Sequence, residues 1–193
     1  MDKSRVETFS DGVFAIVITL LILDLHVPDV SYSQLPQALV GMVPKLTSYF
    51  LSFAIIGLYW VGHHYYFRFI KKVNNVFVWL NLFLLLLVSL LPIPTALLGR
   101  YAFQTIPMLI YGINLLALNL FSLGVLYYVH RRQDLATPEF SAGVFQRFVR
   151  LYLIVNSAYV IAIGFSFVAP VVSYIIYILV LLYAIKLYAI RET

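Results

Sequence analysis

Six long apolar segments constrain the fold of this chain more than any other feature of its sequence. Charged residues, proline and glycine mark their ends, at about residues 9–27, 46–67, 73–98, 103–130, 145–168 and 171–190. A helix needs about 20 apolar residues to cross a hydrocarbon core of roughly 30 Å. Because each segment has about this length, the chain is predicted to be an all-α membrane protein with six transmembrane helices. A turn or helical overhang beginning near Leu35 is expected before the second helix.

The composition excludes other classes of protein. Of the 193 residues 63% are hydrophobic and only 11% are charged, whereas soluble domains carry about 25% charged residues. A membrane β-barrel requires apolar and polar residues to alternate, and runs such as LNLFLLLLVSLL lack this alternation. We therefore expect a single membrane domain over residues 1–193. Its first helix should be retained, because the DLHVPDV that follows is not a signal-peptide cleavage site.

Lysine and arginine predict the orientation in the membrane. Eleven of the 13 fall on one side of a six-helix arrangement, and Lys45 and Arg100 fall on the other. By the positive-inside rule both termini are expected in the cytoplasm. The net charge of +5 is therefore explained by the basic residues that set the membrane orientation. No nucleic-acid partner is expected. The eleven are Lys3, Arg5, Arg68, Lys71, Lys72, Arg131, Arg132, Arg147, Arg150, Lys186 and Arg191.

The first apolar segment has a carboxylate near each end. Only 12 uncharged residues separate Asp11 from Asp24, a length of about 18 Å as a helix. In one interpretation Ser10 and Asp11 cap the helix N-terminus, but a helix from Gly12 to before Pro28 would still be shorter than the hydrocarbon core and would keep Asp24 inside it. In the other interpretation the helix faces an aqueous cavity, where both carboxylates stay hydrated and attract cations.

Polar residues of the second and third segments are candidate partners for Ser10 and Asp11. Trp60 and His63 lie three residues apart near the cytoplasmic end of the second helix and so share one face. Asn81 lies about nine residues into the third segment. We interpret these residues as a polar network that joins the first three helices. An interfacial anchor remains the alternative for Trp60.

The positions of three charged or titratable residues around their helices limit which groups they can contact. These residues are Arg5, His63 and His64. Arg5 and Asp11 lie about 120° apart on a helix, so each is expected to bond to a neighbouring helix rather than to the other. His63 and His64 lie about 100° apart and are not expected to bind one metal ion together. The role of His64 stays open. The chain has no cysteine, which excludes a disulfide or a thiolate metal site, and we expect no cofactor.

Two apolar stripes on the first helix compete for the role of a pore lining. Ile16, Leu20 and Leu23 form one stripe at helical spacing, with Thr19 beside it. Residues 13, 17 and 21 form another stripe that is equally apolar. Because the helix is apolar on all sides, periodicity does not decide which stripe faces a pore and which packs against other helices.

The residues RVETFSD, read as R-x-x-x-F-S-D at the start of the first of six helices, resemble the signature of the transmembrane protein 175 family. This family comprises the endolysosomal potassium channel of animals and its prokaryotic relatives. Trp60, His63, Asn81 and Pro92 extend the resemblance along the second and third helices. The chain has one set of six helices, as in the prokaryotic form. The resemblance implies a homotetramer in the plasma membrane with a central pore lined by the first helix.

The resemblance also implies roles for individual residues. The bulky aliphatic constriction of the pore corresponds to Ile16, with Leu20 and Leu23 one and two turns further outward, and Thr19 corresponds to a threonine implicated in selectivity. Asp24 and Asp11 are expected to place charge at the pore mouths. The expected function is a cation channel that prefers potassium weakly over sodium and has a hydrophobic gate. The network that holds the pore helix corresponds to Arg5, Phe9, Ser10, Asp11, Trp60, His63 and Asn81.

Three other functions are weighed against a potassium channel. A proton-conducting channel or proton-coupled carrier would use Asp11, His63 and Asp24 as a relay. A scaffold without transport would use its polar residues only to lock helices together. An enzyme is not expected, because no G-x-S-x-G, H-E-x-x-H or phosphate-binding glycine loop is present. A T-V-G-Y-G carbonyl filter is also missing.

Overall fold

The computed structural model describes the backbone of residues 2–190 and the side chains of residues 2–187. Within this part of the chain six helical spans are long and apolar enough to cross a membrane. The six-helix prediction is therefore confirmed. The helices are α1 (Lys3–Leu20), α2 (Leu35–Gly41), α3 (Val43–Phe67), α4 (Asn75–Ser89), α5 (Pro92–Arg100), α6 (Thr105–Arg131), α7 (Ala142–Phe165) and α8 (Pro170–Ile190).

The third apolar segment is predicted as one helix and forms two, α4 and α5. Pro92 and Pro94 lie in the first turn of α5, where a missing backbone N–H and a fixed φ are tolerated. Inside a continuous helix each proline would remove a hydrogen bond and clash with the preceding turn. The chain therefore turns at Leu90 and Leu91 and continues, so that α4 and α5 together make one span. The short helix α2 confirms the overhang expected from Leu35.

The first helix begins earlier than the sequence pattern predicts. It starts at Lys3, six residues before Phe9, and its last turn tightens into a 3-10 helix over Leu21–Asp24. Ser10 and Asp11 consequently lie in the middle of α1, so their interpretation as an N-terminal cap is wrong. Asp24 is the last residue of the span rather than a residue inside it. The polar residues before Phe9 extend the helix because tertiary contacts, such as the burial of Val6, support it.

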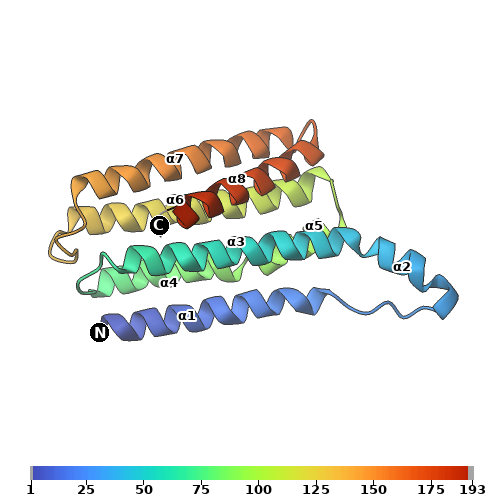
Figure 1. Cartoon of the computed structure of the whole chain (residues 1–193), viewed down its shortest axis with the longest axis horizontal. Coiled ribbons are helices and arrows are strands. Elements are labelled where there is room, and N and C mark those ends of the chain that lie inside the picture. The colour runs from blue at the N-terminus through green and yellow to red at the C-terminus, as the bar shows by residue number, and fades with distance from the viewer. Residues whose placement is uncertain (1, 191–193) are drawn as a thin grey trace.

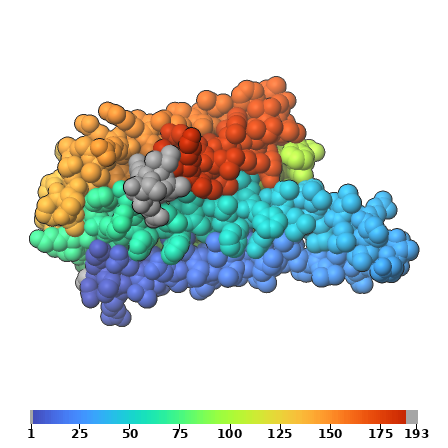
Figure 2. Space-filling model, viewed as in Figure 1, coloured from blue at the N-terminus to red at the C-terminus, as the bar shows by residue number. Residues whose placement is uncertain are grey.

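The helices lie side by side in an elongated bundle in which α1 occupies one edge (Figure 1). α1 packs against α3 and α4, and α6 packs against α4, α7 and α8. The link from α1 to α2 projects beyond one end of the bundle (Figures 1 and 2). One apolar core, which includes Phe14, Ile55 and Leu115, extends along the bundle toward the end at which α2 lies. A second, around Phe67 and Phe77, lies near the other end.

The links after α3 and α6 meet at the end of the bundle opposite α2. Ile70 and Ala136 form an antiparallel bridge, and the Lys71 N–H donates to the Leu135 carbonyl at 2.7 Å. Asp134 accepts a hydrogen bond from Arg132 at 3.1 Å, and this contact lowers the pKa of its carboxyl group from the ordinary value. Most of the expected basic residues gather at this end, whereas Arg191 lies outside the described residues. Lys45 and Arg100 lie at the other end, near the start of α3 and at the end of α5.

Candidate pore helix and its polar support

The two apolar stripes of α1 have opposite environments. Val17 and Leu21 are each 3% exposed and pack in the core with Phe14. Ile16 and Leu23 are 60% and 65% exposed. The structure therefore turns the Ile16, Leu20 and Leu23 stripe away from its own bundle. In this position it is free to face lipid, water or another copy of the chain.

Small and polar residues accompany this exposed stripe. Gly12, Ala15 and Thr19 are also exposed, so the outward face of α1 is not uniformly bulky. The Thr19 hydroxyl donates within the helix, with the Ala15 carbonyl at 3.0 Å and the Ile16 carbonyl at 2.8 Å. Because its proton is used inside the helix, the hydroxyl oxygen can present its lone pairs outward. A hydroxyl held in this way is suited to contact a cation.

A buried chain of hydrogen bonds connects the inner face of α1 to α4 and α3. The Asn81 amide Nδ2 donates to Ser10 Oγ at 2.9 Å, and its Oδ1 lies 2.9 Å from His63 Nε2. Ser10 Oγ donates in turn to the Val6 carbonyl at 2.8 Å. Ser10, Asn81 and His63 are 0%, 1% and 4% exposed. The structure thus brings together three residues that the sequence assigns to one network.

Asp11 and Trp60 form a second contact between α1 and α3. The Trp60 indole Nε1 donates to Asp11 Oδ1 at 2.9 Å. Trp60 lies seven residues before the end of α3, a depth of about 10 Å along the helix. Asp11 lies beside it and remains exposed on the surface of the protomer. A carboxylate at this depth is costly in contact with lipid, so this surface of α1 is better suited to face water or protein.

Arg5 and Phe9 do not take part in these hydrogen bonds between the helices. Arg5 is exposed and has no hydrogen bond or ion pair within the described residues. Phe9 is 53% exposed on the outward side of α1. Their assignment to the network therefore stays a prediction that a single protomer does not test. His64 lies exposed beside the Trp60 ring, with ring centroids 6.4 Å apart.

Asp24 lies at the other end of the exposed stripe. It is half-buried and borders a hollow of about 290 Å³ together with Leu20, Leu23 and Lys45. The hollow lies between the end of α1, α3 and α5, at the end of the bundle from which α2 projects. Asp11 and Asp24 therefore lie on either side of the stripe along α1, and their role at the pore mouths stays a prediction.

Aromatic residues that the sequence reasoning missed pack around the His63 imidazole, among them Tyr66, whose ring meets it edge-on at a centroid distance of 5.1 Å. The Phe67 ring stacks on it at a centroid distance of 4.4 Å, and the Phe14 ring meets it edge-on at 5.5 Å. Both lie four residues after a member of the network, Phe67 after His63 and Phe14 after Ser10. This i, i+4 spacing places each ring one turn along the same face and is the signal that could have identified them.

Within the described residues no group of three or more histidine, aspartate or glutamate side chains is arranged to hold a metal ion. The site is instead the helix α1, of which one face is hydrogen-bonded to α3 and α4 and the other is exposed on the surface of the protomer. Its chemistry consists of hydrogen bonding, apolar surface and two carboxylates. These features suit the passage or exclusion of ions rather than bond making.

Comparison with known proteins relates this arrangement to a family. Residues 5–92 match the family model described as the endosomal/lysosomal potassium channel TMEM175. A potassium channel of Chryseobacterium is 36% identical over 182 residues, covering 94% of this chain and 92% of the relative. A potassium channel of Streptomyces collinus is 34% identical over 87% of this chain and 84% of its own length.

Solved structures and animal relatives extend the comparison. The crystal structure of a lysosomal potassium-selective channel TMEM175 homolog from Chamaesiphon minutus matches with a TM-score of 0.82 and 27% identity over 99% of this chain and 98% of that one. The mouse endosomal/lysosomal proton channel TMEM175 is 43% identical over 102 residues, which are 48% of this chain and 20% of the mouse protein. The chain described above is a multi-pass membrane protein that belongs to the TMEM175 family.

Proposed function

We propose that this chain forms a potassium channel whose pore is lined by α1. Bacterial relatives that span most of its length are named potassium channels. The observation that carries the proposal within this chain is the outward face of α1, where an apolar stripe runs between two carboxylates. Asp11 lies about 10 Å inside the span, and a water-filled path along this face would keep it hydrated.

The proposed assembly is a homotetramer. One α1 helix cannot enclose a path for ions, so several copies of the chain must contribute it. The position of α1 at one edge of the bundle supports this, because its exposed face can meet other copies without displacing its own neighbours (Figure 1). The number four comes from the family resemblance. We place the assembly in the plasma membrane with both termini in the cytoplasm, consistent with the basic residues gathered at one end of the bundle.

The proposed constriction consists of four copies each of Ile16, Leu20 and Leu23. Rings of aliphatic side chains close a narrow pore by expelling water, and a small rotation of the helices that widens the rings lets water and ions return. Thr19 lies between the Ile16 and Leu20 rings and would offer hydroxyl oxygens to a partly dehydrated cation. Selectivity from a few hydroxyl groups should be weaker than selectivity from a carbonyl filter.

Potassium flux into liposomes that contain the purified protein tests this proposal. The Ile16→Asn variant should increase flux and lower the preference for potassium over sodium, because a polar ring wets the constriction. Ile161→Asn on α7 is the matched control, since Ile161 is 53% exposed on a helix that lies away from α1. If flux through the Ile16→Asn variant equals that of the native protein, α1 does not line the pore.

Proton transport is the alternative function, favoured only by the names of animal relatives that match about half of this chain. In the described contacts Asp11 bonds to Trp60 and His63 bonds to Asn81, so no direct hydrogen bond joins the members of the proposed relay. The same liposomes separate the two functions. A proton-coupled carrier saturates with substrate and stops when the proton gradient is collapsed, whereas a channel shows unitary currents without a gradient.

A further inference from the structure

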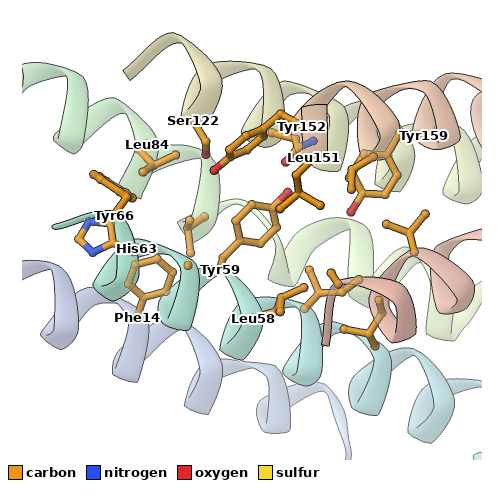
Figure 3. Close-up of a pocket in the computed structure, with 18 residues that line it drawn as sticks. Phe14, Leu58, Tyr59, His63, Tyr66, Leu84, Ser122, Leu151, Tyr152 and Tyr159 are labelled. Atoms are coloured by element: carbon orange, nitrogen blue, oxygen red, sulfur yellow. The ribbon is translucent and has the colours of Figure 1, made fainter. Parts of the chain in front are cut away.

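A cavity of about 60 Å³ lies inside the protomer, away from the exposed face of α1. Most of its lining residues come from α3, α7 and α8, and α1, α4 and α6 supply the rest. Figure 3 shows its lining, with Tyr59 reaching in from α3 and Leu151, Tyr152 and Tyr159 facing it from α7. Apolar side chains form most of the wall, but hydroxyl and amide groups interrupt it at several points.

The wall of this cavity contains a polar group that has no hydrogen-bond partner within the described residues. The Tyr66 hydroxyl is fully buried and unpartnered on a side chain that is 4% exposed. His63 also lines the cavity, and only its Nε2 is used, by Asn81, within the described residues. Asn119 of α6 also lines the cavity, and its Nδ2 donates to Asn156 Oδ1 at 2.9 Å.

Leaving such groups dry is costly. A buried donor or acceptor without a partner loses its hydration with nothing in return, and native proteins leave few such groups. A volume of about 60 Å³ admits roughly two to four water molecules at about 15–30 Å³ each, and a buried water molecule needs two to four polar partners. Cavities that stay empty are apolar throughout, and this one is not.

We propose that this cavity is a binding site for a small cluster of water molecules. The waters hydrogen-bond the Tyr66 hydroxyl and the second ring nitrogen of His63, and extend toward Asn119. The water cluster then continues the chain from His63 through Asn81 to Ser10. In this way polar groups inside the protomer stabilise the position of the buried face of α1. This effect does not depend on whether the exposed face lines a pore.

Hydroxyl-radical footprinting with X-ray pulses tests for bound water, because radicals formed from that water oxidise the side chains beside it. We expect Tyr66 to be oxidised several-fold faster than Tyr177 in the purified protein. Tyr177 is the matched control, since it is 0% exposed and its hydroxyl donates to the Met108 carbonyl at 2.9 Å. Equal rates for the two tyrosines would overturn the proposal.

Two variants make the test independent of any transport assay. Ala184 is 6% exposed and lines the cavity, so Ala184→Leu should fill it and reduce the oxidation of Tyr66 to the rate of Tyr177. Tyr66→Phe removes the hydroxyl, and the sign of the resulting change in Tm shows whether water occupies the cavity. If water binds the hydroxyl, its removal lowers Tm or leaves it unchanged. A rise in Tm would show a dry, unsatisfied hydroxyl and would contradict the proposal.

Discussion

Asn81 connects two helices to α1 because a side-chain amide can donate and accept at the same time. Its Nδ2 group donates to Ser10 while its Oδ1 pairs with His63 Nε2, which also requires the proton of that imidazole to lie on Nε2 if the ring is neutral. An ionised carboxylate at this position would have no proton to donate to Ser10 Oγ. The geometry therefore suits an amide.

Asn81→Ala should destabilise the protein by about 2 kcal/mol or more, because buried polar groups on two helices lose their partner at once. The measurement is thermal unfolding in detergent, with the free energy compared at one temperature. Asn75→Ala is the control, since Asn75 is exposed at the start of the same helix. A change no larger than that of the control would show that the network does not contribute to stability.

At the scale of elements, α6 packs closely against α7 and α8 at one glycine. A Cβ atom placed on Gly112 would overlap the Tyr177 hydroxyl of α8 and lie 2.8 Å from Ile163 of α7. At Gly124, further along the same helix, a Cβ atom would have nothing within 4 Å. Small residues permit close approach of membrane helices, so Gly112 and not Gly124 determines how near these helices come.

These two glycines predict opposite effects of one substitution. Gly112→Ala should lower Tm, because the Tyr177 ring must move and its bond to the Met108 carbonyl is disturbed. Gly124→Ala should stabilise the helix by about 0.5–1 kcal/mol, because alanine has less conformational entropy than glycine to lose when the chain folds. Thermal unfolding of both variants in the same detergent checks this. Equal shifts would contradict the assignment of the close contact to Gly112.

At the scale of the whole molecule, the six candidate spans predict that both ends of the described chain lie on the same side of the membrane. The links with ion pairs at Asp134 lie at the end of the bundle where α1 begins, and the projecting link before α2 lies at the opposite end (Figure 1). The absence of native cysteine makes the orientation simple to measure, because every introduced thiol is unique.

We expect Tyr32→Cys to react with a membrane-impermeant maleimide added to intact cells. Tyr32 is 90% exposed in the projecting link. Ser4→Cys, near the start of α1, should react only after the membrane is permeabilised, since the basic end of the bundle is expected in the cytoplasm. Labelling of Ser4→Cys and not Tyr32→Cys in intact cells would reverse the orientation.

Much of the fold follows from local pattern. Segment length and hydropathy predict all six spans, because a bilayer imposes one length on every helix that crosses it. The break between α4 and α5 was missed, although Pro92 and Pro94 signal it, since the apolar run continues through them. The start of α1 was missed because residues 3–8 are too polar to count as a span and are held helical by tertiary contacts such as that of Val6.

The sequence by itself determined the membrane class, the number of spans and the polar residues that must find partners, because these depend on composition and spacing along the chain. Only the tertiary structure decided which stripe of α1 is buried. Val17 and Ile16 are equally apolar neighbours, yet one is 3% and the other 60% exposed. A helix that is apolar all round carries no preferred rotation of its own. Its orientation is fixed by the hydrogen bonds of Ser10 and Asp11 to Asn81 and Trp60, which residues far along the chain supply.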